Sequence, residues 1–223
     1  MWTCYITDRS GFSGGESGRQ AQLLRMVAEA SRAGVDYIQL REKDLPPRAL
    51  EELARQALRA VRDHGQASLL INHRTDVALA MGADGVHLTG DDIAIADVRT
   101  IAAKAGRTNF LVGISCHSPA EVHTAAADGA DLALLAPIFE KASANLPGIG
   151  LEALRAVALA PHRAAASLNP GAPRPDFRLF ALGGITPERA AYCAETGADG
   201  VAGIRLFQES TDLHALVRSL HAL

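Results

Sequence analysis

Several short apolar runs of this 223-residue chain end in polar residues that could bind an anion or move a proton. Seven such residues close or follow the runs YIQL, SLLIN, GVHL and FLVGIS: Gln39, Arg41, Lys43, Asn72, Asp92, Ser115 and His117. Arg41 and Lys43 alternate along an extended segment, so both side chains can point the same way and bind an anion. His117 follows a predicted strand end, where an imidazole can exchange protons near neutral pH. The pattern predicts an anion-binding site with one candidate acid–base group.

Purely structural interpretations of these residues remain open. Arg41 and Lys43 could form ion pairs with the acidic residues that alternate with them, Glu42 and Asp44. Asp92, in the segment TGDDI, could cap a helix N-terminus instead of binding a metal.

Two histidines and one cysteine in or near predicted strand ends also have structural interpretations. His87, inside the run GVHL, is expected to be a packed or hydrogen-bonded core histidine, and Cys116 a packed thiol. His117 in SCHSPAE could simply face solvent beside a helix cap.

A second anion-binding site is predicted in the segment LGGITPE. Gly183 and Gly184 precede Thr186, which is suited to cap a helix, and Pro187, which is suited to its first position. Free backbone N–H groups at such a helix start can bind phosphate, although the segment could also be an ordinary strand-to-helix turn.

The elements that must position these residues are predicted from an internal repeat. The strings GVDYIQL, GADGVHL, GADLALL and GADGVAGI begin at glycines spaced 48, 47 and 68 residues apart. Each follows an alanine-rich helical stretch, so its glycine is expected to end a helix and its apolar run to form a buried parallel strand. One more strand between successive copies, with WTCYIT at the start, gives about eight strands alternating with helices. This predicts a single-domain (β/α)8 barrel, in which phosphate sites often follow the seventh strand; a doubly wound open sheet is the alternative.

The longer third interval contains a proline-rich stretch. We expect residues 161–177 to form a loop insertion between a helix and the next strand, on the face of the barrel opposite the active site.

Composition excludes several classes of protein. The net charge is only −3, basic residues are scattered and aromatic residues make up 4%, so nucleic acid is not an expected partner. Three separated cysteines indicate reduced thiols. The sequence has no transmembrane run and the start MWTCYITDRS has no signal-peptide pattern, so we expect no membrane association and a cytoplasmic location.

Spaced motifs along nearly the whole chain resemble the thiamine-phosphate synthase and TenI superfamily. They are QLREKD, INHRTDVALAMGADGVHL, GISCHS, APIF and ALGGITPERAAYCAETGADGVA. The resemblance implies a (β/α)8 barrel that joins hydroxymethylpyrimidine diphosphate to thiazole phosphate and releases diphosphate, with magnesium on the diphosphate. It implies small phosphorylated pyrimidine and thiazole partners, and a homo-oligomer is possible.

The resemblance also implies roles for the pyrimidine side of the site. Gln39 would contact the pyrimidine, Arg41, Lys43 and Asn72 would hold the diphosphate, and Ser115 would lie beside it.

On the other side, the turn at Gly183 and Gly184 and the backbone near Ile204 would bind the thiazole phosphate. Asp92 would help to bind magnesium.

The sequence departs from the synthase pattern at three places. His73 stands where the family has a second magnesium carboxylate, so we expect magnesium to be held mainly by Asp92 and the diphosphate oxygens of the substrate. The loop after PIF is short and leaves Lys141 and Ser143 as approximate replacements for a threonine-rich loop. Arg205 replaces a small serine near the thiazole phosphate, where it could add charge or block the site.

Two alternatives to the synthase therefore remain. The SxHS motif of TenI-like thiazole tautomerases matches Ser115, His117 and Ser118, and such a proton transfer needs no metal. A barrel without catalytic activity that binds thiazole or thiamine phosphate is the alternative of another class.

Overall fold

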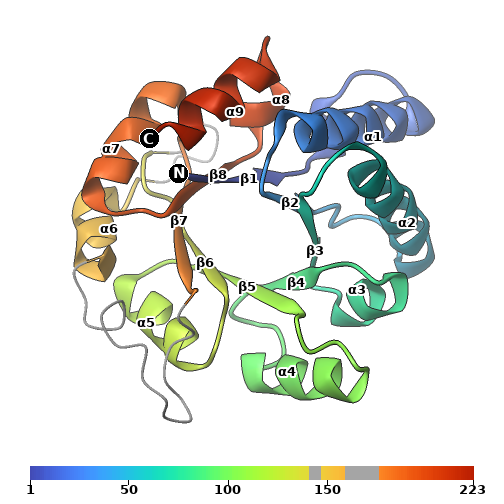
Figure 1. Ribbon diagram of the computed structural model, residues 1–223, viewed down its shortest axis with the longest axis horizontal. Helices are drawn as coiled ribbons and strands as arrows, with labels where there is room; N and C mark the ends of the chain where they lie inside the picture. The colour runs from blue at the N-terminus through green and yellow to red at the C-terminus, as the bar shows by residue number, and fades with distance from the viewer. Residues whose placement is uncertain (141–146, 159–175) are drawn as a thin grey trace.

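Eight parallel strands close into a barrel in the computed structural model, which describes residues 1–140, 147–158 and 176–223 (Figure 1). Each strand pairs with its neighbours in sequence, and β8 pairs with β1. The strands are β1 (Trp2–Ile6), β2 (Tyr37–Leu40), β3 (Ser68–Asn72), β4 (Gly85–Leu88), β5 (Leu111–Cys116), β6 (Leu132–Leu135), β7 (Arg178–Leu182) and β8 (Gly200–Gly203). The predicted (β/α)8 barrel is confirmed, and the open sheet is wrong.

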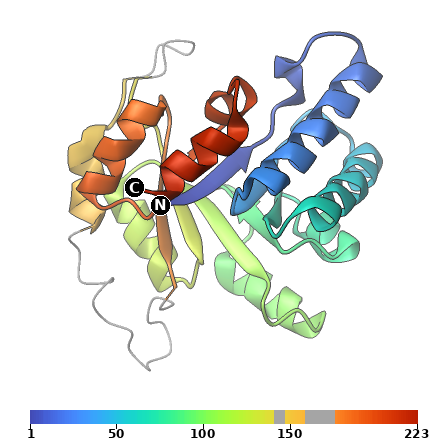
Figure 2. The ribbon, with the colours of Figure 1, turned by 45° about the horizontal axis from the view of Figure 1, so that its top comes forward.

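Helices form the outer layer of the barrel (Figure 2). They are α1 (Glu16–Ala33), α2 (Pro47–His64), α3 (Thr75–Met81), α4 (Ile95–Lys104), α5 (Pro119–Ala127), α6 (Gly150–Ala158), α7 (Pro187–Thr196), α8 (Arg205–Gln208) and α9 (Leu213–His221), with a short 3-10 helix η1 (Arg9–Gly11) after β1. The chain ends lie side by side, since the Met1 amino group donates to the Leu220 carbonyl oxygen at 2.9 Å. No helix of the described ranges is both long and apolar enough to cross a membrane.

The repeated glycines end helices as their spacing predicts, with one variation. Gly34, Gly82 and Gly197 are left-handed C-caps of α1, α3 and α7, a conformation that glycine adopts without strain. After α5, Asp128 is the C-cap, and Gly129 takes the left-handed conformation one residue later.

The repeated aspartates have a role that the sequence did not reveal. They lie two residues after the repeated glycines, just before alternate strands: Asp36, Asp84, Asp131 and Asp199. Each carboxylate accepts a backbone N–H of the preceding strand in the barrel, at 2.7–2.8 Å, from Thr3, Leu69, Val112 and Leu179 respectively. Hydrogen bonds to a charged acceptor are stronger than neutral ones, so the repeat fastens adjacent strands at their amino ends.

The barrel is filled by its own side chains. Alternating strand positions turn inward and form a closed cluster: Cys4, Ile6, Tyr37, Leu70, Leu132, Leu134, Phe180 and Ala202. The rings of Tyr37 and Phe180 meet edge to face with their centroids 5.7 Å apart. The barrel is therefore a packed core, and a site can open only where the strands end.

The predicted insertion at 161–177 lies almost wholly outside the described residues. Its placement on the face opposite the active site stays a prediction.

Candidate active site

A pocket of about 190 Å³ opens at the carboxyl ends of the strands. Six of the seven residues predicted to share this mouth line it, together with apolar strand-end side chains and Thr89: Ile6, Gln39, Arg41, Lys43, Asn72, Thr89, Ser115, His117, Leu134 and Leu182. A wider groove of about 1010 Å³ lies on α1 and α2, away from the strand ends. Since the groove has none of the predicted site residues, we place the candidate site in the smaller pocket.

Two amides on neighbouring strands form one wall of the pocket. Gln39 Nε2 donates to Asn72 Oδ1 at 2.8 Å, and both side chains are buried. The Gln39 Oε1 atom is buried with no hydrogen-bond partner in the described part of the chain. This oxygen is therefore an acceptor available to a ligand that brings an N–H or O–H group.

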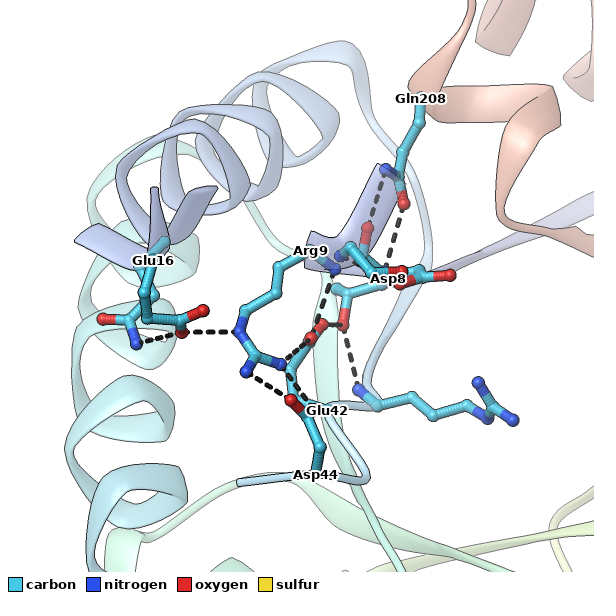
Figure 3. Close-up of polar contacts among 10 residues, drawn as sticks. Asp8, Arg9, Glu16, Glu42, Asp44 and Gln208 are labelled. Atoms are coloured by element: carbon cyan, nitrogen blue, oxygen red, sulfur yellow. Dashed lines mark hydrogen bonds and ion pairs between the residues drawn. The ribbon is translucent and has the colours of Figure 1, made fainter. Parts of the chain in front are cut away.

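The cations after β2 do not pair with the acids that alternate with them, so that interpretation is wrong. Arg9 binds both Glu42 and Asp44 instead, as Figure 3 shows. Arg41 and Lys43 line the pocket and form no ion pair within the described ranges. Two positive charges are thus free to meet an anion in the mouth.

A buried histidine holds the serine of the site. His87 Nε2 lies 2.9 Å from Ser115 Oγ, which confirms that His87 is a core histidine. Burial, and then the charges of His73 and Arg41, lower the pKa of His87 to about 3. The imidazole is therefore neutral at pH 7 and adds no charge beside Arg41.

His117 is exposed to solvent and also lines the pocket. Its Nδ1 atom lies 2.9 Å from the carbonyl oxygen of Ala136, which can only accept a hydrogen bond. The proton of the neutral ring therefore sits on Nδ1, which leaves Nε2 as the basic nitrogen. Cys116 next to it is buried, as expected, and burial raises the pKa of its thiol to about 12.

Asp92 is neither a helix cap nor part of a complete metal site. Helix α4 begins at Ile95 after Ala94, so the capping interpretation is wrong. The two Asp92 carboxylate oxygens lie 2.9 and 2.8 Å from His73 Nδ1, and Oδ2 also accepts the Thr89 N–H at 2.7 Å. No group of three or more potential metal-binding side chains exists among the described residues. One carboxylate beside an imidazole is a poor donor set for magnesium, so these residues do not fit a resident magnesium ion.

The glycine turn after β7 is packed too tightly for any other residue. Gly183 and Gly184 have positive φ values of 99° and 63°, and a Cβ atom on either would lie 2.8 Å from Pro137 or Phe139. Thr186 caps α7 as predicted, with its hydroxyl oxygen accepting the Arg189 N–H at 3.3 Å.

The remaining predicted residues lie beyond the pocket lining. Ile204 is half-buried, Arg205 is exposed at the start of α8, and neither residue lines the 190 Å³ pocket. Lys141 and Ser143 lie outside the described residues.

Sequence reasoning missed the apolar residues of the pocket and Thr89. Ile6 and Leu182 are the last residues of β1 and β7, and Leu134 is the next to last residue of β6; all three lie on the inward face, so period-two alternation could have found them. Thr89 directly follows the last residue of β4, a position like those of the other polar residues of the site.

The fold and the site together define a (β/α)8 barrel with a cationic mouth, a class shared by many phosphate-binding enzymes. The sequence model of the family described as "Thiamine monophosphate synthase" matches residues 6–207. The chain belongs to this family.

Two relatives show how far the similarity extends. A "Thiamine-phosphate synthase" of Methanoculleus marisnigri is 40% identical over 205 residues, which cover 91% of this chain and 88% of the relative. A "Putative thiamine-phosphate synthase 2" of Aquifex aeolicus is 37% identical, over 92% of this chain and 96% of the relative.

A solved structure resembles the barrel over the same extent. The "Thiamine phosphate pyrophosphorylase" of Pyrococcus furiosus has a TM-score of 0.75 and 28% identity, over 99% of this chain and 94% of that one.

Proposed function

We propose that this chain is a thiamine-phosphate synthase that joins hydroxymethylpyrimidine diphosphate to thiazole phosphate. The observation that carries the proposal is the pair of cations, Arg41 and Lys43, that face the pocket while Arg9 holds the neighbouring acids. Family membership and the names of the full-length relatives support the same reaction.

In the proposed reaction the bond between the methylene carbon and the diphosphate oxygen breaks, and its electron pair leaves with diphosphate. The lone pair of the thiazole nitrogen then forms the new C–N bond to that carbon, giving thiamine phosphate. Negative charge grows on the departing diphosphate, so cations fixed beside it lower the barrier. Arg41 and Lys43 supply this charge, and Asn72 and the Ser115 hydroxyl supply neutral hydrogen bonds.

The pyrimidine is proposed to lie against the amide wall. Gln39 Oε1 is the buried acceptor without a partner in the described ranges, and the amino group of the pyrimidine is a matching donor. The apolar side chains of Ile6 and Leu134 would cover the ring and limit the access of water to the reactive carbon.

The thiazole phosphate is proposed to bind at the ends of β7 and β8. The turn of Gly183 and Gly184 and the backbone near Ile204 would donate N–H groups, and Arg205 would add a charge from the exposed side. Lys141 and Ser143, which precede α6 in the sequence, are proposed to contribute as well.

Magnesium is proposed to bind only together with the diphosphate. Asp92 is the one carboxylate among the residues predicted for this site, and both of its oxygens already contact His73. We therefore expect no binding of magnesium alone at millimolar concentration, and measurable binding once inorganic diphosphate is present, both followed by calorimetry.

The direct test is formation of thiamine phosphate from the two substrates with magnesium, with and without a chelator. Arg41→Met should lower kcat/KM by about 10²–10³, as removal of one charge-stabilising donor does elsewhere. Arg55→Met is the matched control, because Arg55 forms its ion pairs with Glu51 and Glu52 on the outer face of α2. A wild-type protein that forms no thiamine phosphate would contradict the proposal.

The tautomerase alternative depends on His117. The contact of its Nδ1 atom with Ala136 fixes the basic nitrogen, which is the arrangement that a proton-transfer group needs. Metal-free tautomerisation that disappears in His117→Ala, without any synthase activity, would favour this alternative. If the protein shows neither activity, the remaining hypothesis is a barrel without catalytic activity that binds thiazole or thiamine phosphate.

A further inference from the structure

We propose that Arg9 is a positioning residue for the diphosphate-binding cations, and that the segment Thr7–Asp8–Arg9 braces both phosphate-binding sides of the mouth. We call this segment the β1 brace. The inference rests on the proposed synthase function and extends it to residues that do not line the pocket.

The Arg9 side chain lies at the centre of a three-carboxylate cluster. Its side chain is only 7% exposed, and it reaches Glu42, whose side chain is 2% exposed, at 3.0 Å. Nη1 and Nη2 each donate to one oxygen of Asp44 at 2.7 Å, while Nε donates to Glu16 at 2.7 Å (Figure 3). All three guanidinium nitrogens are used, which is a geometry that lysine cannot reproduce.

The contacts of Arg9 fix the orientation of the charged side chains at residues 41–44, directly after β2. Residues 41–44 alternate in sign, and the segment ends in a turn in which the Leu45 N–H donates to the Glu42 carbonyl oxygen at 3.3 Å. Arg9 holds the two acids on the side away from the pocket, while Arg41 and Lys43 line the pocket. Without Arg9, the carboxylates would lose their cation and the nearest replacements would be the two cations of the mouth.

Thr7 fixes the backbone of the same segment. Its hydroxyl donates to Glu42 Oε1 at 2.6 Å and accepts the Arg41 N–H at 2.9 Å. The Arg9 backbone N–H also donates to Glu42, at 3.2 Å. The Glu42 carboxylate is therefore bound by the side chains of Thr7 and Arg9 and by the Arg9 backbone N–H. The backbone of Arg41 is held by its hydrogen bond to Thr7.

The same brace reaches the other phosphate side through Asp8. The Asp8 N–H donates to Gln208 Oε1, and Gln208 Nε2 donates to the Asp8 carbonyl oxygen, both at 3.1 Å. Gln208 ends α8, the short helix that begins directly after Ile204. The β1 brace thus contacts both the residues that follow β2 and helix α8, which follows β8. A displacement of the residues after β2 is therefore transmitted to α8, and the reverse.

The first experiment measures binding of inorganic diphosphate by calorimetry to wild type, Arg9→Met, Arg9→Lys and the control Arg55→Met. In Arg9→Met the carboxylates of Glu42 and Asp44 lose their cation and repel the diphosphate. The affinity for diphosphate should therefore fall at least about tenfold. Arg9→Lys should recover only part of the loss, and Arg55→Met should match wild type. Circular dichroism and the melting temperature establish that each variant is folded.

The decisive variant is the double substitution Arg9→Met with Glu42→Gln. If Arg9 acts by restraining a negative charge, replacing Glu42 by its neutral analogue should restore most of the diphosphate affinity. A merely structural Arg9 would give a double variant no better than Arg9→Met. That result, or diphosphate binding that is unchanged in Arg9→Met, would overturn the inference.

Steady-state kinetics separate the inference from the proposed function. Arg9→Met should raise KM for the pyrimidine diphosphate more than it lowers kcat, and Gln208→Leu should raise KM for the thiazole phosphate by at least about threefold. An unchanged KM for the thiazole phosphate in Gln208→Leu would overturn the second half of the brace. If the wild type forms no thiamine phosphate but diphosphate binding still follows the Arg9 series, the proposed function fails and the positioning role stands.

Discussion

Acidification should destabilise this protein through one buried histidine. His87 is 1% exposed, and burial is the main cause that lowers its pKa to about 3, whereas an unfolded chain has a histidine pKa of about 6.5. Between these two values the unfolded state binds more protons, so stability is complete above about pH 6.5 and falls as the pH decreases toward 3. At pH 5.5 protonation stabilises the unfolded state about tenfold, which corresponds to a loss of stability on the order of 1 kcal/mol relative to pH 7.5.

The assay is urea unfolding of wild type and His87→Gln at pH 7.5, 6.5 and 5.5. Glutamine does not titrate, and its side chain can keep a hydrogen bond to Ser115. The difference in unfolding free energy between the two proteins should shift by roughly 1 kcal/mol in favour of the variant across this range. His64→Gln is the control, because His64 is exposed at the end of α2. Equal acid sensitivity of wild type and His87→Gln would refute the reasoning.

Three further substitutions test the core, the repeat and the metal. Gly200→Ala should cost about 1–3 kcal/mol in urea unfolding, because its Cβ atom would lie 2.4 Å from the buried ring of Phe180. Asp131→Ala should cost about 3–5 kcal/mol by the same assay, since it removes a buried carboxylate that holds an arginine of α4 and the backbone of β5. His73→Asp should strengthen the magnesium binding that calorimetry detects in the presence of diphosphate, because two carboxylates would then face the ion; reversal of this gain on adding Asp92→Asn is the control.

The fold was predictable because its signals are local. The glycine that ends a helix and the apolar run that forms the next strand lie within a few residues of each other in the sequence. Their repetition indicates a closed barrel. The aspartate of the repeat was visible as a pattern, but its role was not. Each carboxylate bonds to a strand that lies about 15 to 33 residues earlier in the chain, and only the closed fold brings the two together.

The site was predictable in its composition and less so in its contacts. Arg41 and Lys43 were identified from alternation, yet their sequence neighbours Glu42 and Asp44 were equally plausible partners. The choice is made by Arg9, which comes from the previous strand–helix loop. The contact of His73 with Asp92 likewise joins the loops after β3 and β4, so neither residue alone indicates it.

The pocket carries polar groups that a ligand could satisfy. Gln39 Oε1 is buried without a partner in the described ranges, and such an atom costs about 1–3 kcal/mol. Arg41 and Lys43, which form no ion pair with any described residue, add mutual repulsion that an anion would remove. Both costs lie in one pocket, whereas the aspartates that fasten the strands lie at the opposite ends of the strands. The ligand-facing polar groups and the aspartates that fasten the strands therefore lie at opposite ends of the barrel, so the mouth can change without loss of these strand contacts.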